Sequence, residues 1–208
     1  MALKSIRSIL AVSFILFLFT DIIPVDSVQA LSSYSYTDNL PLLNEFVSQV
    51  KNGQTGELRG IYVPEILATR VVQQPKGNNK FVSSRQNIVT QFELASRFGS
   101  IGLLAHNHLA GERFSLLEEN QKFYLIYGDG QISVFVVTEI LRYQALIPNS
   151  VSSKFIDLEN SNALTASKLF SKVYDRPGHV IFQTCISTGK NLSWGRLFVI
   201  AKPYSQKP

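Results

Sequence analysis

The sequence HVIFQTCISTGKNLSWGRLFVIAKP, residues 179–203, contains two apolar runs, at residues 180–184 and 197–201, separated by a more polar segment with two glycines. Short apolar runs that are rich in β-branched and aromatic residues and joined by a turn are typical of paired strands. Cys185, the only cysteine of the chain, follows the first run, and Arg196 precedes the second. If the two strands pair, these two side chains can lie side by side at one rim of a sheet.

Much of the remaining chain also consists of short apolar runs bounded by turn residues. The clearest hairpin signal is Gly128-Asp129-Gly130, flanked by strands at residues 123–127 and 131–138. Residues 139–146 are predicted to extend or follow this hairpin. Further strands are predicted at residues 61–64, 66–73, 81–82 and 100–105. Because the strands are short and outnumber the helices, the pattern favours a mostly-β fold, a barrel or a sandwich with a few short peripheral helices.

Three helices are predicted, near residues 40–51, 91–98 and 164–174. The first and third have apolar residues at helical spacing. The second is predicted from Thr90-Gln91-Phe92-Glu93, which has the form of a capping box. Residues 148–162 are polar and are predicted to be irregular.

The N-terminus has the pattern of a secretory signal peptide. Lys4 and Arg7 precede an apolar stretch at residues 9–19, and Val28-Gln29-Ala30 has the small or branched residues that a signal peptidase prefers. The apolar stretch is short for a membrane span, although an uncleaved anchor is the alternative. Either way the sequence predicts an exported protein, secreted or associated with the cell surface or membrane.

The sequence therefore divides into residues 1–30 as signal peptide or uncleaved anchor, residues 31–55 as a tether and short helix, and residues 56–208 as one domain. The net charge is +5, and the 20 Lys and Arg residues are scattered, with no run and no aromatic interleaving, which disfavours a nucleic-acid partner. A single cysteine excludes an intramolecular disulfide. It leaves a free thiol, an intermolecular bridge, or a buried and inert cysteine.

A cysteine acts as a nucleophile only as the thiolate, so a catalytic cysteine needs a group that stabilises this form or takes its proton. The chain has three histidines, His106, His108 and His179. His106 directly follows the apolar run at residues 101–105, so it lies at the end of a predicted strand. Arg196 has a guanidinium that can hold a carbonyl or an oxyanion without losing its charge.

At this point the sequence resembles the sortases, the cysteine transpeptidases of bacterial cell surfaces, over about residues 60–202. Leu104-Ala105-His106-Asn107 resembles the histidine segment of the family. Ile181-Phe182-Gln183-Thr184-Cys185 resembles its Thr-Leu-x-Thr-Cys motif, and Trp194-Gly195-Arg196-Leu197-Phe198-Val199 resembles its arginine strand. The order and spacing of these segments agree with the family.

The resemblance implies a closed, sortase-like eight-stranded barrel with Cys185, His106 and Arg196 as catalytic residues at one end. Cys185 would form a thioacyl enzyme with a sorting-signal peptide, His106 would act as general acid or base, and Arg196 would orient the peptide and stabilise the oxyanion. Thr184 and Ala105 would contact the substrate. The implied partners are sorting-signal peptides of surface proteins and an amine acceptor, such as a cell-wall precursor or a pilin lysine. No cofactor is expected, and calcium dependence is left open, as is hydrolysis against transpeptidation.

Two alternatives are weighed against this interpretation. His106 and His108 would lie on one face of a strand, and with Glu112 they could form a metal site, as in the cupins, which are also barrels. This hypothesis leaves Cys185 and Arg196 unexplained. The other alternative is a sortase-like barrel that binds peptide or wall polymer without turnover. His108 and His179 are assigned structural roles in the preferred interpretation.

Overall fold

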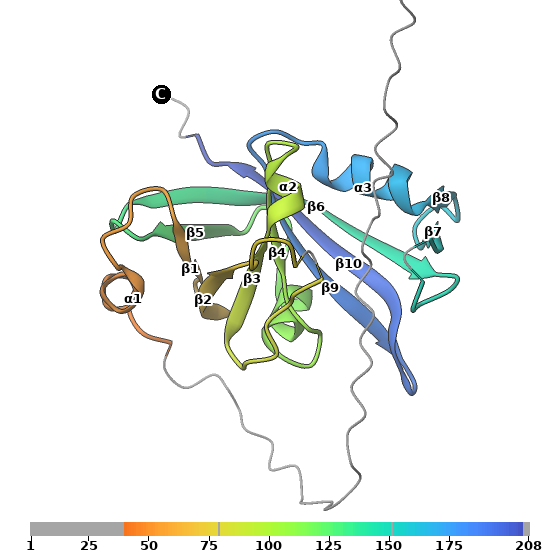
Figure 1. Cartoon of the computed structure of the whole chain (residues 1–208), viewed down its shortest axis with the longest axis horizontal. Coiled ribbons are helices and arrows are strands. Elements are labelled where there is room, and N and C mark those ends of the chain that lie inside the picture. The colour runs from red at the N-terminus through yellow and green to blue at the C-terminus, as the bar shows by residue number, and fades with distance from the viewer. Residues whose placement is uncertain (1–39, 79, 151, 206–208) are drawn as a thin grey trace, which may run out of the picture.

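The computed structural model describes residues 40–78, 80–150 and 152–205 of the chain (Figure 1). The predicted signal peptide or anchor and the tether at residues 31–39 lie outside the described residues. Within the described part, none of the helices is long and apolar enough to span a membrane.

The described residues form ten strands, three α-helices and one 3₁₀ helix. The strands are β1 (Leu58–Val63), β2 (Leu67–Gln73), β3 (Ile88–Phe92), β4 (Ile101–Leu104), β5 (Lys122–Tyr127), β6 (Ile132–Ala145), β7 (Lys154–Asp157), β8 (Ala163–Thr165), β9 (Val180–Thr188) and β10 (Asn191–Pro203). The helices are α1 (Leu43–Val50), α2 (Glu93–Ser96), the 3₁₀ helix η1 (Ala110–Leu116) and α3 (Ala166–Tyr174).

Eight of the strands close into a barrel, as the sequence predicted. Their order is β10-β9-β4-β3-β2-β1-β5-β6, and pairing of β6 with β10 closes the ring. β6 is long enough to pair with β5, with β10 and, near its end, with β7. β7 and β8 continue the sheet outside the ring. Most neighbours are antiparallel, but β2 with β3 and β4 with β9 are parallel.

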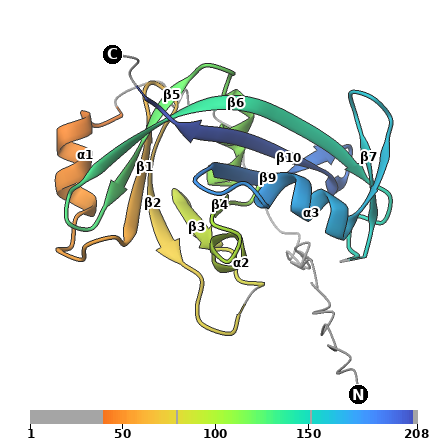
Figure 2. The same ribbon diagram turned by 90° about the horizontal axis from the view of Figure 1, so that it is seen from above.

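The strands have two buried faces. Inward-facing residues such as Phe123, Phe182 and Val199 fill the barrel. On the outer face of β4, β9 and β10, residues such as Ile181 and Phe198 pack against α2 and α3. Figure 2 shows α3 lying across β9 and β10, while α1 lies on the other side of the molecule beside β1 and β5. The central strands therefore carry apolar side chains on both faces, with successive residues pointing to opposite faces.

The hairpin, the first and third helices and the two C-terminal strands lie where the sequence predicted them, although β9 and β10 extend farther toward each other. Residues 139–145 extend the hairpin as part of β6.

Three predictions were wrong. Residues 81–82 form no strand, and Thr90 belongs to β3 rather than to a helix cap. The Thr90 hydroxyl accepts a hydrogen bond from the Ser83 N–H at 2.9 Å, and β3 pairs with β2 and β4. Helix α2 therefore begins only at Glu93. The segment 148–162, predicted to be irregular, contains β7, which is stabilised by pairing with the end of β6.

Candidate active site

Cys185 and Arg196 are direct cross-strand partners in the β9–β10 pair. Side chains alternate between the two faces of a strand, so Cys185 shares its face with Ile181, and Arg196 shares its face with Phe198. Both of these apolar residues belong to the outer core. The strand pairing therefore places the thiol and the guanidinium side by side on the outer face of the barrel, as the sequence predicted.

His106 follows the end of β4, which runs parallel to β9 with Leu104 opposite Gln183. The Ala105 N–H continues this ladder by donating to the Gln183 carbonyl at 3.3 Å. His106 lies two residues beyond Leu104, as Cys185 lies two residues beyond Gln183, so the two residues occupy neighbouring positions on the same face. Neighbouring strands are about 4.8 Å apart. His106 is buried, with 6% of its surface exposed.

The row formed by His106, Cys185 and Arg196 continues onto two further strands. Tyr143 of β6 lies opposite Arg196, and Asp157 of β7 lies opposite Tyr143. Lys172 of α3 covers this end of the row, with its Nζ 3.5 Å from Asp157 Oδ2 and 5.5 Å from the centroid of the Tyr143 ring. Sequence reasoning missed Tyr143, Asp157 and Lys172, because only the register of β6 and β7 reveals that they extend the row.

Arg196 is fully buried and is held by backbone carbonyls. Its Nη1 donates to the carbonyl oxygens of Ser193 at 2.9 Å and Gly195 at 2.7 Å, and its Nη2 donates to that of Pro148 at 3.2 Å. Its Nε has no hydrogen-bond partner among the described residues. Burial lowers the pKa of the guanidinium, while the adjacent Cys185 raises it. Arginine is nevertheless a permanent cation in proteins.

Burial raises the pKa of the Cys185 thiol above its ordinary value, and the charge of Arg196 and a hydrogen bond with Ser193 lower it only in part. The net direction is upward, so the neutral thiol predominates near neutral pH. A nucleophilic role would therefore need a base that takes the proton when a substrate is bound.

Thr184 and Ala105, predicted to contact substrate, contact each other. Thr184 Oγ1 donates to the Ala105 carbonyl at 2.9 Å. Gly111 of η1 packs against the contact between Thr184 and Ala105. A Cβ atom at Gly111 would lie 2.4 Å from Thr184 Oγ1 and 2.6 Å from the His106 carbonyl oxygen. Only glycine allows η1 to approach β9 this closely, and the sequence contained no signal for this contact.

Cys185 lines a groove of about 430 Å³ at this end of the barrel. The walls come from the segment after β4 together with η1, from the second half of β9 and the middle of β10, and from β6 and the segment after β7. The lining residues are Asn107, Gly111, Glu112, Ser115, Arg142, Leu158, Thr184, Cys185, Ile186, Ser187 and Leu197. His106 and Arg196 flank Cys185 but are not lining residues of this groove.

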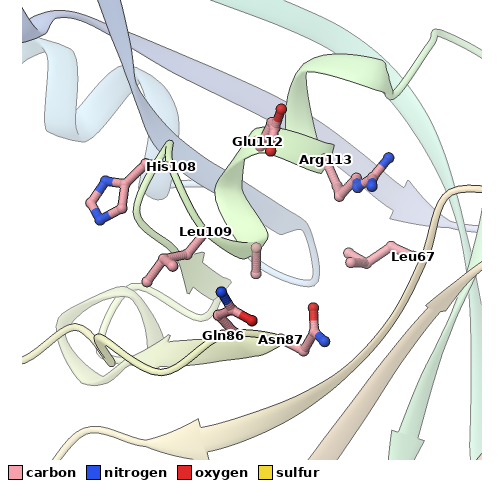
Figure 3. A pocket seen from close by; sticks show the side chains of 8 residues that line it. Leu67, Gln86, Asn87, His108, Leu109, Glu112 and Arg113 are labelled. Atoms are coloured by element: carbon pink, nitrogen blue, oxygen red, sulfur yellow. The ribbon is translucent and has the colours of Figure 1, made fainter. Parts of the chain in front are cut away.

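The metal-site hypothesis for His106, His108 and Glu112 was wrong. It required a strand through the two histidines, but β4 ends at Leu104, and the Leu109 N–H donates to the His106 carbonyl in a turn that leads into η1. His106 is buried, whereas His108 is exposed. Figure 3 shows His108 pointing away from Glu112, although both residues line a second pocket, of about 150 Å³. Among the described residues, no three His, Cys, Asp or Glu side chains form a group that could hold a metal ion.

His179, the third histidine, directly precedes β9 and lies six residues before Cys185. Its Nδ1 is 3.1 Å from the Pro177 carbonyl oxygen. It is therefore not part of the row on the outer face.

No protein-family model matches the chain, and no curated protein matches its sequence significantly. Its structure is similar to solved sortases. Sortase C-1 from Actinomyces oris shares 14% identity, with a TM-score of 0.48 over 83% of this chain and 86% of that one. Sortase C1 from Streptococcus suis shares 15%, with a TM-score of 0.48 over 79% of each chain. A lid mutant of Streptococcus agalactiae sortase C1 shares 17%, with a TM-score of 0.46 over 74% of this chain and 73% of that one.

Proposed function

We propose that the chain is a sortase-type cysteine transpeptidase that cleaves a sorting-signal peptide and transfers its acyl part to an amine. One observation carries the proposal. Cys185 and Arg196 are direct cross-strand partners, and the register of β4 puts His106 at the neighbouring position on the same face. The three residues also lie in the segments that resemble the sortase motifs.

In the first half of the reaction, the Cys185 sulfur attacks a backbone carbonyl of the peptide. His106 takes the thiol proton, which the raised pKa of Cys185 makes necessary. The carbonyl oxygen becomes an oxyanion, and the nearby guanidinium of Arg196 stabilises it. The C–N bond then breaks, His106 protonates the leaving amine, and a thioacyl enzyme is left on Cys185.

In the second half, an acceptor amine attacks the thioacyl carbonyl, the C–S bond breaks, and Cys185 regains its proton. The groove beside Cys185 gives an acceptor access to this carbonyl. Thr184 and Ala105 keep the middle of β9 in contact with the segment that carries His106, and in the proposed enzyme they border the bound peptide. The pattern of residues 1–30 extends the proposal to an exported protein whose peptide and amine partners lie at the cell surface.

The test is direct detection of the thioacyl enzyme. The full chain is incubated with a library of fluorogenic peptides, and intact mass spectrometry follows acylation while fluorescence follows cleavage. Acylation of Cys185 and release of the acyl group by an added amine are expected. Cys185→Ala should abolish both, and His106→Ala should slow cleavage by about 10²–10⁴-fold, the usual contribution of general acid–base catalysis.

Two further variants complete the experiment. Arg196→Lys keeps the charge but loses the planar fork, so it should be nearly as inactive as Arg196→Ala. His108→Ala is the matched control, because it removes an exposed imidazole two residues from His106, and it should keep the wild-type rate. Cleavage by Cys185→Ala at the wild-type rate would refute the proposal. Tight peptide binding without a thioacyl enzyme would instead support the binding module that does not turn over.

A further inference from the structure

Ser193 is a buried polar residue at the otherwise exposed end of the β9–β10 hairpin. Residues 187–192 are all exposed, whereas Ser193 is only 5% exposed. Burial of a hydroxyl is costly unless the hydroxyl has a hydrogen-bond partner, so packing by itself does not explain a serine at this position. The contacts of the hairpin end around Ser193 give the explanation.

An irregularity in the β9–β10 ladder lies at Ser193. Asn191 pairs with Thr188, and Gly195 pairs with Ile186. Between these two pairs β10 advances by four residues while β9 advances by two, so β10 bulges. A bulge bends its strand and can re-aim a side chain.

The bulge brings the Ser193 side chain to the candidate site. With regular alternation, a residue three positions before Arg196 would point to the face opposite Arg196 and Cys185. Instead, the side chain of Ser193 is hydrogen-bonded to Cys185. The bulge therefore turns Ser193 back toward the sulfur.

The bulge also contacts the other two segments of the candidate site. The Ser193 carbonyl accepts a hydrogen bond from Arg196 Nη1 at 2.9 Å, and the Gly195 carbonyl accepts one from the same nitrogen at 2.7 Å. The Leu192 carbonyl accepts one from Asn107 Nδ2 at 3.0 Å, in the segment after β4 that carries the candidate histidine. One short irregular segment thus contacts all three parts of the site.

Two residues of the bulge determine its shape. Asn191 Oδ1 accepts a hydrogen bond from the Ser193 N–H at 3.0 Å, which is the local turn that asparagine favours. At Gly195, a Cβ atom would lie 2.6 Å from the Tyr143 carbonyl oxygen and 3.3 Å from the Ile186 Cβ. Only glycine lets β10 lie this close to β6, so the bulge is fixed at both ends.

We propose that Ser193 is a positioning residue of the transfer reaction, whose hydroxyl donates to the Cys185 sulfur as the thiolate forms and whose carbonyl keeps Arg196 beside that sulfur. The inference rests on the proposed function and adds to it a residue that holds two of the catalytic residues together. Ser193 takes no proton, since the thiol proton passes to His106. A donated hydrogen bond stabilises an anionic sulfur more than a neutral one.

Replacement of Ser193 by alanine changes none of the charged or titratable side chains around the sulfur. These are His106 after β4, Arg196 of β10, Glu112 of η1, Arg142 of β6 and, farther along the row, Tyr143, Asp157 and Lys172. Burial raises the pKa of the Cys185 thiol, and the charge of Arg196 and the hydrogen bond with Ser193 oppose this. Loss of the hydroxyl should therefore raise the pKa of the thiol further.

The pH dependence of alkylation tests the hydroxyl without any peptide. Reaction of Cys185 with iodoacetamide is followed by intact mass spectrometry at a series of pH values. Ser193→Ala should move the midpoint to higher pH by about 0.5–1 pH unit, the effect of one hydrogen bond on a proton equilibrium. Ser193→Thr keeps the hydroxyl and should stay close to the wild type. Thr188→Ala is the matched control, because Thr188 is exposed on the same hairpin and does not line the groove.

The maximal rate of alkylation separates positioning from packing. Well above the pKa every molecule carries the thiolate, so the plateau reports the access of the reagent to the sulfur. Ser193→Ala should keep the plateau of the wild type. A higher plateau with an unchanged midpoint would mean that Ser193 only fills space and would overturn the proposal. An equal shift of the midpoint in Ser193→Thr or Thr188→Ala would overturn it as well.

Asn191→Ala tests the bulge. This variant removes the Oδ1 acceptor but keeps the Ser193 hydroxyl, so it should move the midpoint in the same direction by a smaller amount. In a chain that carries both Ser193→Ala and Arg196→Gln, Asn191→Ala should add no further shift, because both groups that the bulge positions are gone. A further shift in that chain would show that the bulge acts on the sulfur by another route and would contradict the assignment.

Acylation by a cleaved peptide distinguishes this inference from the proposed function. A midpoint higher by 0.5–1 pH unit lowers the thiolate fraction at pH 7 by about 3–10-fold. Acylation of Ser193→Ala should slow by about this factor with an unchanged KM for the peptide, and Ser193→Thr should restore the rate. Acylation of Ser193→Ala at the wild-type rate would overturn the inference. If the wild type formed no thioacyl enzyme, the proposed function would be refuted, and the alkylation profiles would still decide the role of Ser193.

Discussion

Three effects act on the Cys185 thiol at the residue scale. Burial raises its pKa, whereas the charge of Arg196 and the hydrogen bond with Ser193 lower it. Arg196 is itself held rigidly by three backbone carbonyls, so its charge stays beside the sulfur. Because burial outweighs the other effects, the resting site contains a protonated thiol, which is oxidised less readily than a thiolate.

The pH dependence of alkylation by iodoacetamide tests this balance. Only the thiolate reacts, so wild-type Cys185 should reach half its maximal rate at a pH above the ordinary thiol value of about 8.5. Arg196→Gln removes the charge and should move the profile to still higher pH. Arg196→Lys keeps a cation and should move it less. His108→Ala serves as the control. A wild-type midpoint near neutral pH would contradict the raised pKa.

The sequence predicted part of this site. Cys185, Arg196 and His106 could be placed at neighbouring strand ends because each adjoins an apolar run that predicts its own strand. Tyr143 and Asp157 could not be placed, since their positions depend on the register of β6 against β10 and β7. Gly111 was missed for the same reason. Its close contact is with Thr184, which is distant in sequence.

Among the secondary-structure elements, β7 and α3 lie at the outer end of the row of side chains that begins at His106. Asp157 of β7 connects these two elements. It is 5% exposed. Burial alone would raise the pKa of its carboxyl, but hydrogen bonds from the backbone of Glu159 and Asn160 and the charge of Lys172 outweigh this and lower it. The ionised carboxylate therefore stabilises the folded state, because the unfolded chain holds its proton more tightly.

The pH dependence of stability tests this contribution. A lowered folded-state pKa gives stability that is fully present above the ordinary aspartate value of about 3.9 and is lost as the pH falls through the folded-state pKa. Asp157→Asn should therefore lower the free energy of unfolding at pH 7 by about 1–3 kcal/mol and flatten its decline below pH 4. Urea unfolding at a series of pH values measures both effects. Asp175→Asn, at an exposed position, should change neither.

Elements with strong local signals were predictable from the sequence, and elements that depend on distant partners were not. Gly128-Asp129-Gly130 specifies the hairpin locally, and the apolar spacing of residues 166–174 specifies α3. Thr90 has the local pattern of a helix cap, but pairing with β2 and β4 makes it part of a strand. Residues 148–162 as a whole are polar enough to predict a loop, yet residues 154–157 form β7 because the end of β6 offers unpaired backbone groups.

At the scale of the whole molecule, β9 and β10 belong to both cores. Phe182 of β9 faces the barrel interior, where it contacts Phe114 and Phe123 edge to face. Phe198 of β10 faces outward, where it contacts Tyr143 and Tyr174. The same two strands carry the candidate site and contribute side chains to both cores. Unfolding of either core would therefore displace Cys185 and Arg196. The geometry of the candidate site therefore depends on cooperative folding of the whole domain.

This arrangement predicts that damage to either core lowers the stability of one common unfolding transition. Phe182→Ala and Phe198→Ala should each lower the free energy of unfolding by about 3–5 kcal/mol, because both side chains are fully buried and leave cavities. Two probes follow unfolding in urea, the fluorescence of Trp194, the only tryptophan, and the reactivity of Cys185 with a thiol reagent. Coincident transitions are expected in both variants. Leu192→Ala, at a 54% exposed position, should cost less than about 0.5 kcal/mol. If Cys185 of Phe198→Ala became reactive well before the fluorescence changed, the outer layer would unfold separately and the two cores would be independent.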